Sequence, residues 1–357
     1  MFFYYLKSKF FTYFVRIFFI FFIVNSLQAE DILINSSKMV IAFGSCNDQN
    51  RSQNFWNKIE NISPHLFIFM GDNVYSKNKD ASLEGVALAY ESLKTNEYYR
   101  RFIKNIKHIS IWDDHDYGLN DGGKDYIFKN QSKKLFLDFF NIPSSDERYY
   151  RDGLYKDFNL IYENKIVQII ILDTRFFKSD FSLTDQRGKK GKERYVPNYD
   201  EDNTILGKKQ WNWLSEKLKK EVDLRIIVSS FQVLPDDHGW EKWGNFPLEK
   251  RKLFLNLMRT EKIKTVILSG DRHIGAFYSK KINNEQEIIE VTSSSLNKPL
   301  NFRVLEKDSL QIGNIVTQAN FGLLKIDWNN NDLLIELISS DEKNTLNIPI
   351  IKFRSNL

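Results

Sequence analysis

The sequence predicts a layered α/β fold, because six short apolar segments alternate with helical patterns and each segment ends in a polar cluster. The apolar segments are nearly continuous and rich in β-branched or aromatic residues, which is typical of strands buried on both faces. They cover residues 39–43, 66–70, 109–112, 166–172, 225–228 and 265–268. Ligands bind at the carboxyl ends of the strands in such sheets, so the polar clusters are candidates for a functional site.

Helices are expected between these strands, at residues 53–60, 83–101, 132–141, 208–220 and 249–260. After Asp271 the pattern changes to strand-like segments at 287–292, 322–327 and 332–339, which we expect to form antiparallel strands of a second sheet. A turn is expected at 328–331. Residues 177–203 are polar and glycine-rich without a clear period, and they predict a long loop near the mouth of the site.

Residues 1–29 predict a cleaved secretory signal, because they combine basic residues, no acidic residue, an apolar run at 17–24 and a small residue at Ala29. The apolar run is well short of the roughly 20 residues that a spanning helix needs. An uncleaved membrane anchor is the alternative, since Leu27 is large for its place and apolar residues begin already at Phe10. We therefore expect export to the periplasm or the extracellular space, with membrane contact only through an uncleaved leader.

Removal of this leader, which carries three basic residues, lowers the formal net charge from +5 to +2. The one dense basic stretch, residues 187–194, is interpreted as a solvated loop, so no specific nucleic-acid binding is expected. No linker of proline, glycine and serine divides residues 30–357, which predicts one domain, or one domain with a small appendage. The single cysteine, Cys46, cannot form an internal disulfide and is either an inert buried thiol or a reactive or metal-binding one.

Two strand ends carry carboxylates that can reach a metal ion. Gly71-Asp72 follows the segment at 66–70, and Gly270-Asp271-Arg272-His273 follows the segment at 265–268. If extended geometry continues there, Asp271 and His273 point the same way. Two such ends can hold a pair of metal ions about 3.5 to 4 Å apart, with one carboxylate bridging both.

A third cluster, Trp112-Asp113-Asp114-His115-Asp116, follows the segment at 109–112. A metal centre that hydrolyses phosphate needs a further oxygen ligand and a proton donor for the leaving oxygen. Asp114 suits the ligand and His115 suits the acid. The alternative is an acidic surface turn, but the position directly after an apolar strand favours a function.

In this order and spacing, the clusters resemble the PhoD-like alkaline phosphatases of the calcineurin-like metallophosphoesterase superfamily. The resemblance covers nearly all of the chain after the leader and implies a metallophosphoesterase-type four-layer sandwich, with two central mixed β-sheets flanked by helices. The matching elements are Phe43-Gly44-Ser45-Cys46, Gly71-Asp72-Asn73-Val74-Tyr75, Trp112-Asp113-Asp114-His115, Leu172-Asp173-Thr174-Arg175, His238-Gly239-Trp240, Trp243-Gly244-Asn245-Phe246-Pro247 and Gly270-Asp271-Arg272-His273.

The resemblance implies a ferric ion held by Cys46, Asp72 and Tyr75, and a calcium ion as the second metal, with Asp72 and Asp271 as candidates to contact it. A thiolate and a phenolate stabilise Fe³⁺, whereas Ca²⁺ favours oxygen ligands. Other divalent metals are compatible with the carboxylates. By the same resemblance, Asp114 and His273 match metal-binding positions of the wider superfamily.

Two departures from the wider superfamily favour the iron and calcium type over the zinc or manganese type. Gly44-Ser45-Cys46 replaces the initial Asp-x-His, and Gln232 stands where a histidine follows the fifth strand. Both departures are shared with PhoD-like proteins.

The implied reaction is the hydrolysis of small-molecule, lipid or polymer phosphate esters, in which a metal-bound hydroxide attacks phosphorus and His115 protonates the leaving group. No serine nucleophile is required. Arg175 suits phosphate binding, and a structural salt bridge with Asp173 is the alternative. The aromatic cluster of His238, Trp240 and Trp243 either lines the substrate pocket or packs within a loop.

Two other classes of protein compete with a hydrolase. One is a noncatalytic protein that binds phosphate esters or polymers and retains the fold. The other is a structural protein anchored to a surface by its apolar N-terminus. The complete set of expected ligands together with His115 favours the enzyme.

Overall fold

The computed structural model describes residues 30–76, 83–260, 263–284, 286–300, 307–341 and 349–357. The predicted signal peptide, residues 1–29, lies outside the described residues. Among the residues described, no helix is both long enough and apolar enough to cross a membrane.

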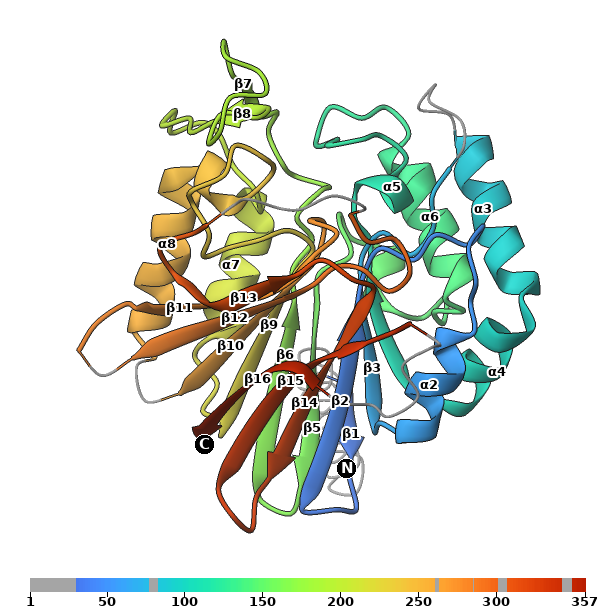
Figure 1. The fold of residues 1–357 in the computed structure, drawn as a ribbon. Coiled ribbons are helices and arrows are strands. Elements are labelled where there is room, and N and C mark those ends of the chain that lie inside the picture. Colours follow the sequence, from blue (N-terminus) through green and yellow to red (C-terminus); the bar gives the residue numbers. More distant parts are fainter. Residues whose placement is uncertain (1–29, 77–82, 261–262, 285, 301–306, 342–348) are drawn as a thin grey trace, which may run out of the picture.

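Two mixed β-sheets pack against each other at the centre of the molecule (Figure 1). The smaller sheet has the strand order β16-β15-β14-β2-β3-β4. Its strands are β2 (Lys38–Gly44), β3 (Leu66–Met70), β4 (His108–Ile111), β14 (Asn320–Asp327), β15 (Asp332–Ser339) and β16 (Pro349–Asn356). Strands β2, β3 and β4 run parallel, so their carboxyl ends meet at one edge of the sheet.

The larger sheet has the strand order β1-β5-β6-β9-β10-β12-β11-β13. Its strands are β1 (Glu30–Leu33), β5 (Lys156–Tyr162), β6 (Lys165–Ile171), β9 (Leu224–Ser229), β10 (Lys264–Ser269), β11 (Gly275–Lys281), β12 (Glu287–Ser293) and β13 (Gln311–Val316). Strands β6, β9 and β10 are parallel, so their carboxyl ends also meet at one edge of their sheet.

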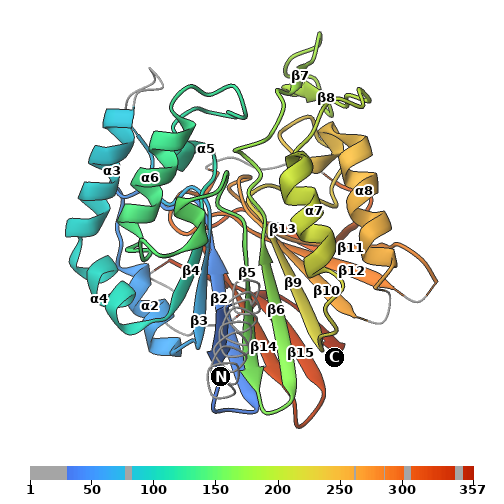
Figure 2. The same ribbon diagram turned by 180° about the vertical axis from the view of Figure 1, so that it is seen from behind.

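Helices cover the outer face of each sheet (Figures 1 and 2). The smaller sheet is covered by α2 (Phe55–Ile62), α3 (Leu83–Thr95), α4 (Glu97–Asn105) and α6 (Lys129–Phe139). The short α5 (Asp114–Tyr117) begins just after the carboxyl end of β4. The larger sheet is covered by α7 (Gly207–Lys217) and α8 (Pro247–Met258). This arrangement confirms the predicted four-layer sandwich.

The two cores follow from the alternation of side chains along buried strands. In β6, Ile169 and Ile171 belong to the core that also contains Phe43 of the opposite sheet. Ile170 lies on the other face, in a second core with Trp211 of α7. Apolar residues on both faces of β6 therefore fix it between the two layers, as its continuous apolar sequence predicts.

The structure corrects two details of the predicted fold. The helix expected at 83–101 is two helices, because Asn96 is extended and its side chain accepts hydrogen bonds from the backbone N–H groups of Tyr98 and Tyr99. This is a typical helix N-cap. The later strands do not share one sheet: β12 pairs parallel with β10, whereas β14 joins β2. Six of the seven residues of β12 are buried, which suits an interior strand.

Residues 177–203 are mostly irregular, as predicted, but contain the short strands β7 (Ser182–Leu183) and β8 (Tyr195–Val196), which pair with each other. This segment rises above the carboxyl ends of β6 and β9 (Figure 1). We call residues 177–203 the arm.

Candidate metal centre

The polar clusters converge because the parallel strands of both sheets end at the same edge of the sandwich. Each strand end delivers one cluster: Cys46 follows β2, Asp72 follows β3, Asp113 and Asp114 follow β4, Arg175 follows β6, Ser230 follows β9, and Asp271 follows β10. The predicted gathering of polar residues at strand ends is therefore what the fold produces.

Four candidate ligands have left-handed backbone conformations, with φ of 60° at Cys46, 51° at Asp72, 70° at Asp271 and 56° at His273. Non-glycine residues rarely adopt this region, and such conformations concentrate at functional sites. The expectation of extended geometry between Asp271 and His273 is therefore wrong. The chain turns back there, with the N–H of Arg272 donating to the carbonyl of Gly270 at 2.9 Å.

Asp72 contacts several of the other candidate metal ligands. Its Oδ2 accepts a hydrogen bond from the Tyr75 hydroxyl at 2.6 Å and lies 3.5 Å from Cys46 Sγ. Its Oδ1 accepts from the backbone N–H of His115 at 3.3 Å. Cys46, Asp72 and His273 each offer a ligand atom within 4.8 Å of the others. The residues predicted for the first metal thus lie together.

Two further groups adjoin the first. Asp72, Asp114 and His115 form one, and Asp113, Asp114 and Asp271 form the other, each with its ligand atoms within 4.8 Å of one another. Asp72 and Asp114 therefore belong to more than one group. Shared carboxylates of this kind can bridge two neighbouring ions.

The electrostatics of the groups are suited to cations. Burial, followed by the charges of Asp114 and Asp113, raises the pKa of Asp72 well above its ordinary value. Burial, followed by Asp113 and Asp114, does the same to the pKa of Asp271. In addition, Asp113 Oδ2 and Asp114 Oδ1 are buried and accept no hydrogen bond from the described residues. Crowded carboxylates with unused oxygens fit metal ions, which would relieve their mutual repulsion.

The types of donor atom also suit the two metals that the sequence resemblance implies, Fe³⁺ and Ca²⁺. Burial raises the pKa of Cys46 and of Tyr75, so a metal ion would be needed to stabilise the thiolate and the phenolate. Both side chains are almost completely buried, as is Asp72. Sulfur and phenolate donors occur on the Cys46 side, and carboxylates alone make up the group of Asp113, Asp114 and Asp271.

The imidazole of His273 is oriented by the backbone. Its Nδ1 lies 2.6 Å from the carbonyl oxygen of Lys298, and because a carbonyl only accepts, Nδ1 must donate. This leaves Nε2 as an acceptor for a metal, as in many metal-binding histidines. Burial, above all, lowers the pKa of His273 to about 4, which also favours the neutral ligand form.

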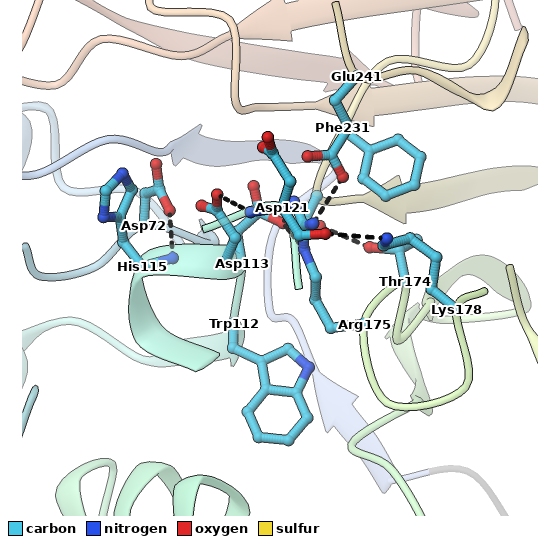
Figure 3. A network of polar contacts seen from close by, with 12 residues as sticks. Asp72, Trp112, Asp113, His115, Asp121, Thr174, Arg175, Lys178, Phe231 and Glu241 are labelled. Carbon is cyan, nitrogen blue, oxygen red and sulfur yellow. Dashed lines mark hydrogen bonds and ion pairs between the residues drawn. The ribbon is translucent and has the colours of Figure 1, made fainter. Parts of the chain in front are cut away.

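Arg175 lies beneath the centre and is fully buried (Figure 3). Its Nη2 is 2.5 Å from Asp113 Oδ1, and its Nη1 is 2.6 Å from Glu241 Oε1. Asp173 contacts Arg175 through the backbone, accepting a hydrogen bond from its N–H at 2.9 Å, whereas the guanidinium pairs with Asp113 and Glu241. The alternative of an ion pair between Arg175 and Asp173 is therefore wrong. The guanidinium instead joins the loop after β4 to the loop that contains Glu241.

The structure adds Asp121 and Glu241 to the site, which sequence reasoning did not assign. With Asp114 they form a further group of possible ligands within 4.8 Å. Glu241 directly follows the quoted motif His238-Gly239-Trp240, and Asp121 lies in a glycine-containing turn, so neither follows a strand. Acidic residues in loops are common on protein surfaces, and no sequence signal singled these two out.

A cavity of about 200 Å³ opens over the donor groups. Asp72, Asp114, His115, Asp271 and His273 line one part of it, and Trp240 lines another. His238 and Trp243 are buried instead, with His238 Nε2 3.0 Å from Gln232 Oε1 and Trp243 donating to Ser229 at 3.0 Å. Of the three aromatic candidates for the pocket wall, only Trp240 reaches the cavity.

A larger cavity of about 700 Å³ lies between the C-terminal parts of α7 and α8. Leu218, Val222 and Arg259 are among its lining residues, and none of the predicted site residues is among them. Its size therefore does not make it the site of the phosphate chemistry, which requires the donor groups described above.

The sequence model of the PhoD-like phosphatases matches residues 41–325. The chain belongs to this family. It is accordingly a phosphoric ester hydrolase, and the family, the fold and the clustered carboxylates together indicate that it depends on metal. A comparison with curated proteins gives no match.

Solved structures show the same fold at low sequence identity. One described as the structure of PhoD is 14% identical, with a TM-score of 0.72, over 90% of this chain and 70% of that one. Purple acid phosphatase PPD1 from yellow lupin seeds is 10% identical, with a TM-score of 0.60, over 90% and 54% of the two chains. GAP50, described as an anchor in the inner membrane complex of Plasmodium, is 14% identical, with a TM-score of 0.55, over 90% and 89%.

Proposed function

We propose that the chain is an exported hydrolase of phosphate esters that uses an iron and a calcium ion, with His115 as the general acid. The observation that carries the proposal is the arrangement at the cavity, where donor groups sharing Asp72 and Asp114 adjoin His115. Family membership supports the reaction class, and the mixed donor set supports the choice of metals.

Cys46, Asp72, Tyr75 and His273 would hold Fe³⁺, and Asp72, Asp114 and Asp271 would hold Ca²⁺. When bound, the two ions supply Lewis acidity toward the phosphoryl oxygens and lower the pKa of water so that it can attack phosphorus. Neighbouring groups keep Asp114 ionised for this role. Burial alone would raise the pKa of Asp114, but the positive charges of His115 and Arg175 hold it at about 2.

His115 is placed to deliver a proton to the leaving oxygen. Its backbone N–H is fixed to Asp72, and its ring lies with its centroid 4.2 Å from that of Tyr75. Burial lowers the pKa of His115, and the Asp114 carboxylate opposes this shift only in part. The side chain lines the cavity and therefore faces the space that the ester would occupy.

The role of His115 can be tested with two esters that differ in their need for a proton. In the His115→Ala variant, kcat for glycerol 3-phosphate should fall by about 10²- to 10⁴-fold, the usual contribution of a general acid. The kcat for p-nitrophenyl phosphate should fall far less, because p-nitrophenolate leaves without protonation. Steady-state kinetics on both esters measure the difference. An equal loss on the two esters would remove His115 from the role of acid.

The choice of metals is tested by elemental analysis of the purified protein. We expect iron and calcium in wild type, and in Cys46→Ala we expect the iron content to fall while calcium is retained, because the thiolate belongs to the iron group only. Ser36→Ala, a change outside the donor groups, should keep both metals. Zinc or manganese in place of iron in the active wild-type protein would contradict this part of the proposal.

The proposals about export and about binding partners rest on the sequence alone. The proposed location is the periplasm or the extracellular space, and the proposed substrates are small-molecule, lipid or polymer phosphate esters, without specific nucleic-acid binding. Mass spectrometry of protein expressed with its leader should show a new N-terminus near residue 30. An intact N-terminus in the purified protein would instead support a permanent membrane anchor.

A further inference from the structure

The part of the cavity wall that carries no metal donors has a chemistry of its own. Arg194, Trp240 and Arg272 line it, together with Leu300. Arg194 comes from the arm, Trp240 from the loop after β9, and Arg272 from the turn between Asp271 and His273. We call Arg194, Trp240 and Arg272 the outer wall. It combines an indole with two guanidinium groups at the same cavity as the donor groups.

The arm and the Trp240 loop are joined into one unit. The carbonyl of Gly239 accepts hydrogen bonds from the backbone N–H groups of both Arg194 and Tyr195, at 2.9 and 2.8 Å. The contact is close, because a Cβ placed on Gly239 would lie 2.3 Å from the backbone nitrogen of Glu193. The outer wall is therefore held in place by the backbone, and not only by side-chain packing.

The side chains of the outer wall are also oriented. The guanidinium carbon of Arg272 lies 5.3 Å from the ring centroid of Trp240, within the range of a cation–π interaction. The Nη1 of Arg194 is 2.9 Å from Asp121 Oδ2, and its side chain is 32% exposed. Both contacts limit the freedom of these side chains before a substrate arrives, which lowers the entropic cost of binding.

We propose that Trp240, flanked by Arg194 and Arg272, recognises the leaving group of the substrate and favours esters that carry a planar aromatic ring, such as a nucleobase. A planar ring can stack on the indole, and guanidinium groups stack on rings and donate to the acceptors at their edges. An alkyl or polyol leaving group offers no stacking face. The inference rests on the proposed function, because it needs the phosphoryl group to lie at the donor groups.

The experiment compares adenosine 5′-monophosphate with glycerol 3-phosphate by measuring phosphate release. Both are alkyl monoesters, so the bond that breaks is alike and the base is the main difference. Wild type should prefer the nucleotide in kcat/KM. Trp240→Leu should lower this preference by about tenfold or more, the scale of one lost base–aromatic stack, while kcat/KM for glycerol 3-phosphate changes little. Trp240→Phe, which keeps an aromatic face, should retain most of the preference.

Two further variants separate recognition from a structural effect. Tyr199→Leu removes an aromatic side chain of the same arm that is 69% exposed, and it should leave the preference unchanged. Gly239→Ala should displace the outer wall through the clash with Glu193, and should reduce the preference as Trp240→Leu does. An equal loss on both esters in Trp240→Leu, or no change on either, would overturn the inference.

The outcome for wild type distinguishes this inference from the proposed function. A wild-type protein that hydrolyses glycerol 3-phosphate as well as the nucleotide overturns the preference alone. A metal-loaded wild-type protein that hydrolyses no phosphate ester overturns the proposed function, and the inference with it.

Discussion

Replacing Asp72 with asparagine is expected to reduce kcat/KM for every phosphate ester by at least about a hundredfold, since even residues that only orient metal ligands contribute 10- to 100-fold. Asparagine keeps the shape of the side chain but lacks the charge and one of the oxygens. The carboxylate belongs to two donor groups, and it contacts Cys46, Tyr75 and the backbone of His115. Its loss should therefore disturb both metals at once.

Steady-state kinetics and metal content, measured on the same preparation, test this expectation. Asp138→Asn is the matched control, because Asp138 is an exposed carboxylate of α6 that pairs with Lys134. The control should keep full activity and both metals. If Asp72→Asn bound both metals and hydrolysed esters at the rate of the control, Asp72 would not be a shared ligand.

Replacing Arg175 with methionine is expected to lower the free energy of unfolding by about 3 to 5 kcal/mol, the usual effect of removing one partner from a buried ion pair. The change would leave Asp113 and Glu241 buried without the guanidinium that pairs with both of them. Burial already raises the pKa of Glu241, and burial raises that of Asp113 to about 6 despite the opposing charge of Arg175. The guanidinium therefore opposes the effect of burial on the pKa of both carboxylates.

Urea denaturation of metal-free protein measures the effect. Arg101→Met is the control, since Arg101 forms an ion pair with Glu60 at the surface and is 51% exposed. Such pairs contribute about 0 to 1 kcal/mol. The sequence left open whether Arg175 binds phosphate. If Arg175→Met raised KM without changing the unfolding free energy, the side chain would act on the substrate directly and not by supporting the fold.

Much of the fold could be predicted because the decisive strands are buried on both faces and end abruptly in polar clusters. The nearly continuous apolar run of β6 is a strong signal. The partner of β12 could not be predicted in this way, since its sequence fits either sheet and only the folded packing decides between them. The break at Asn96 was also missed, because helical propensity continues on both sides of it.

Only part of the candidate site could likewise be predicted from the sequence. Residues that directly follow strands, such as Asp72 and Asp271, could be singled out because a parallel sheet brings strand ends together. Asp121 and Glu241 could not, since they reach the centre from loops whose course depends on tertiary contacts. The partners of Arg175 could not be predicted for the same reason, since Glu241 lies in one of these loops. The assignment of individual ligands to individual metals stays a prediction.

The left-handed backbone at Cys46, Asp72, Asp271 and His273 has a consequence for how such a chain can evolve. Each of these residues occupies a conformation that costs an L-amino acid roughly 1 to 2 kcal/mol and that glycine adopts freely. A change to glycine at any of them would relieve strain and at the same time remove a donor. Stability and catalysis therefore act on these four positions in opposite directions. A descendant released from its enzymatic role would be expected to drift toward glycine there, and so to become more stable as it became inactive.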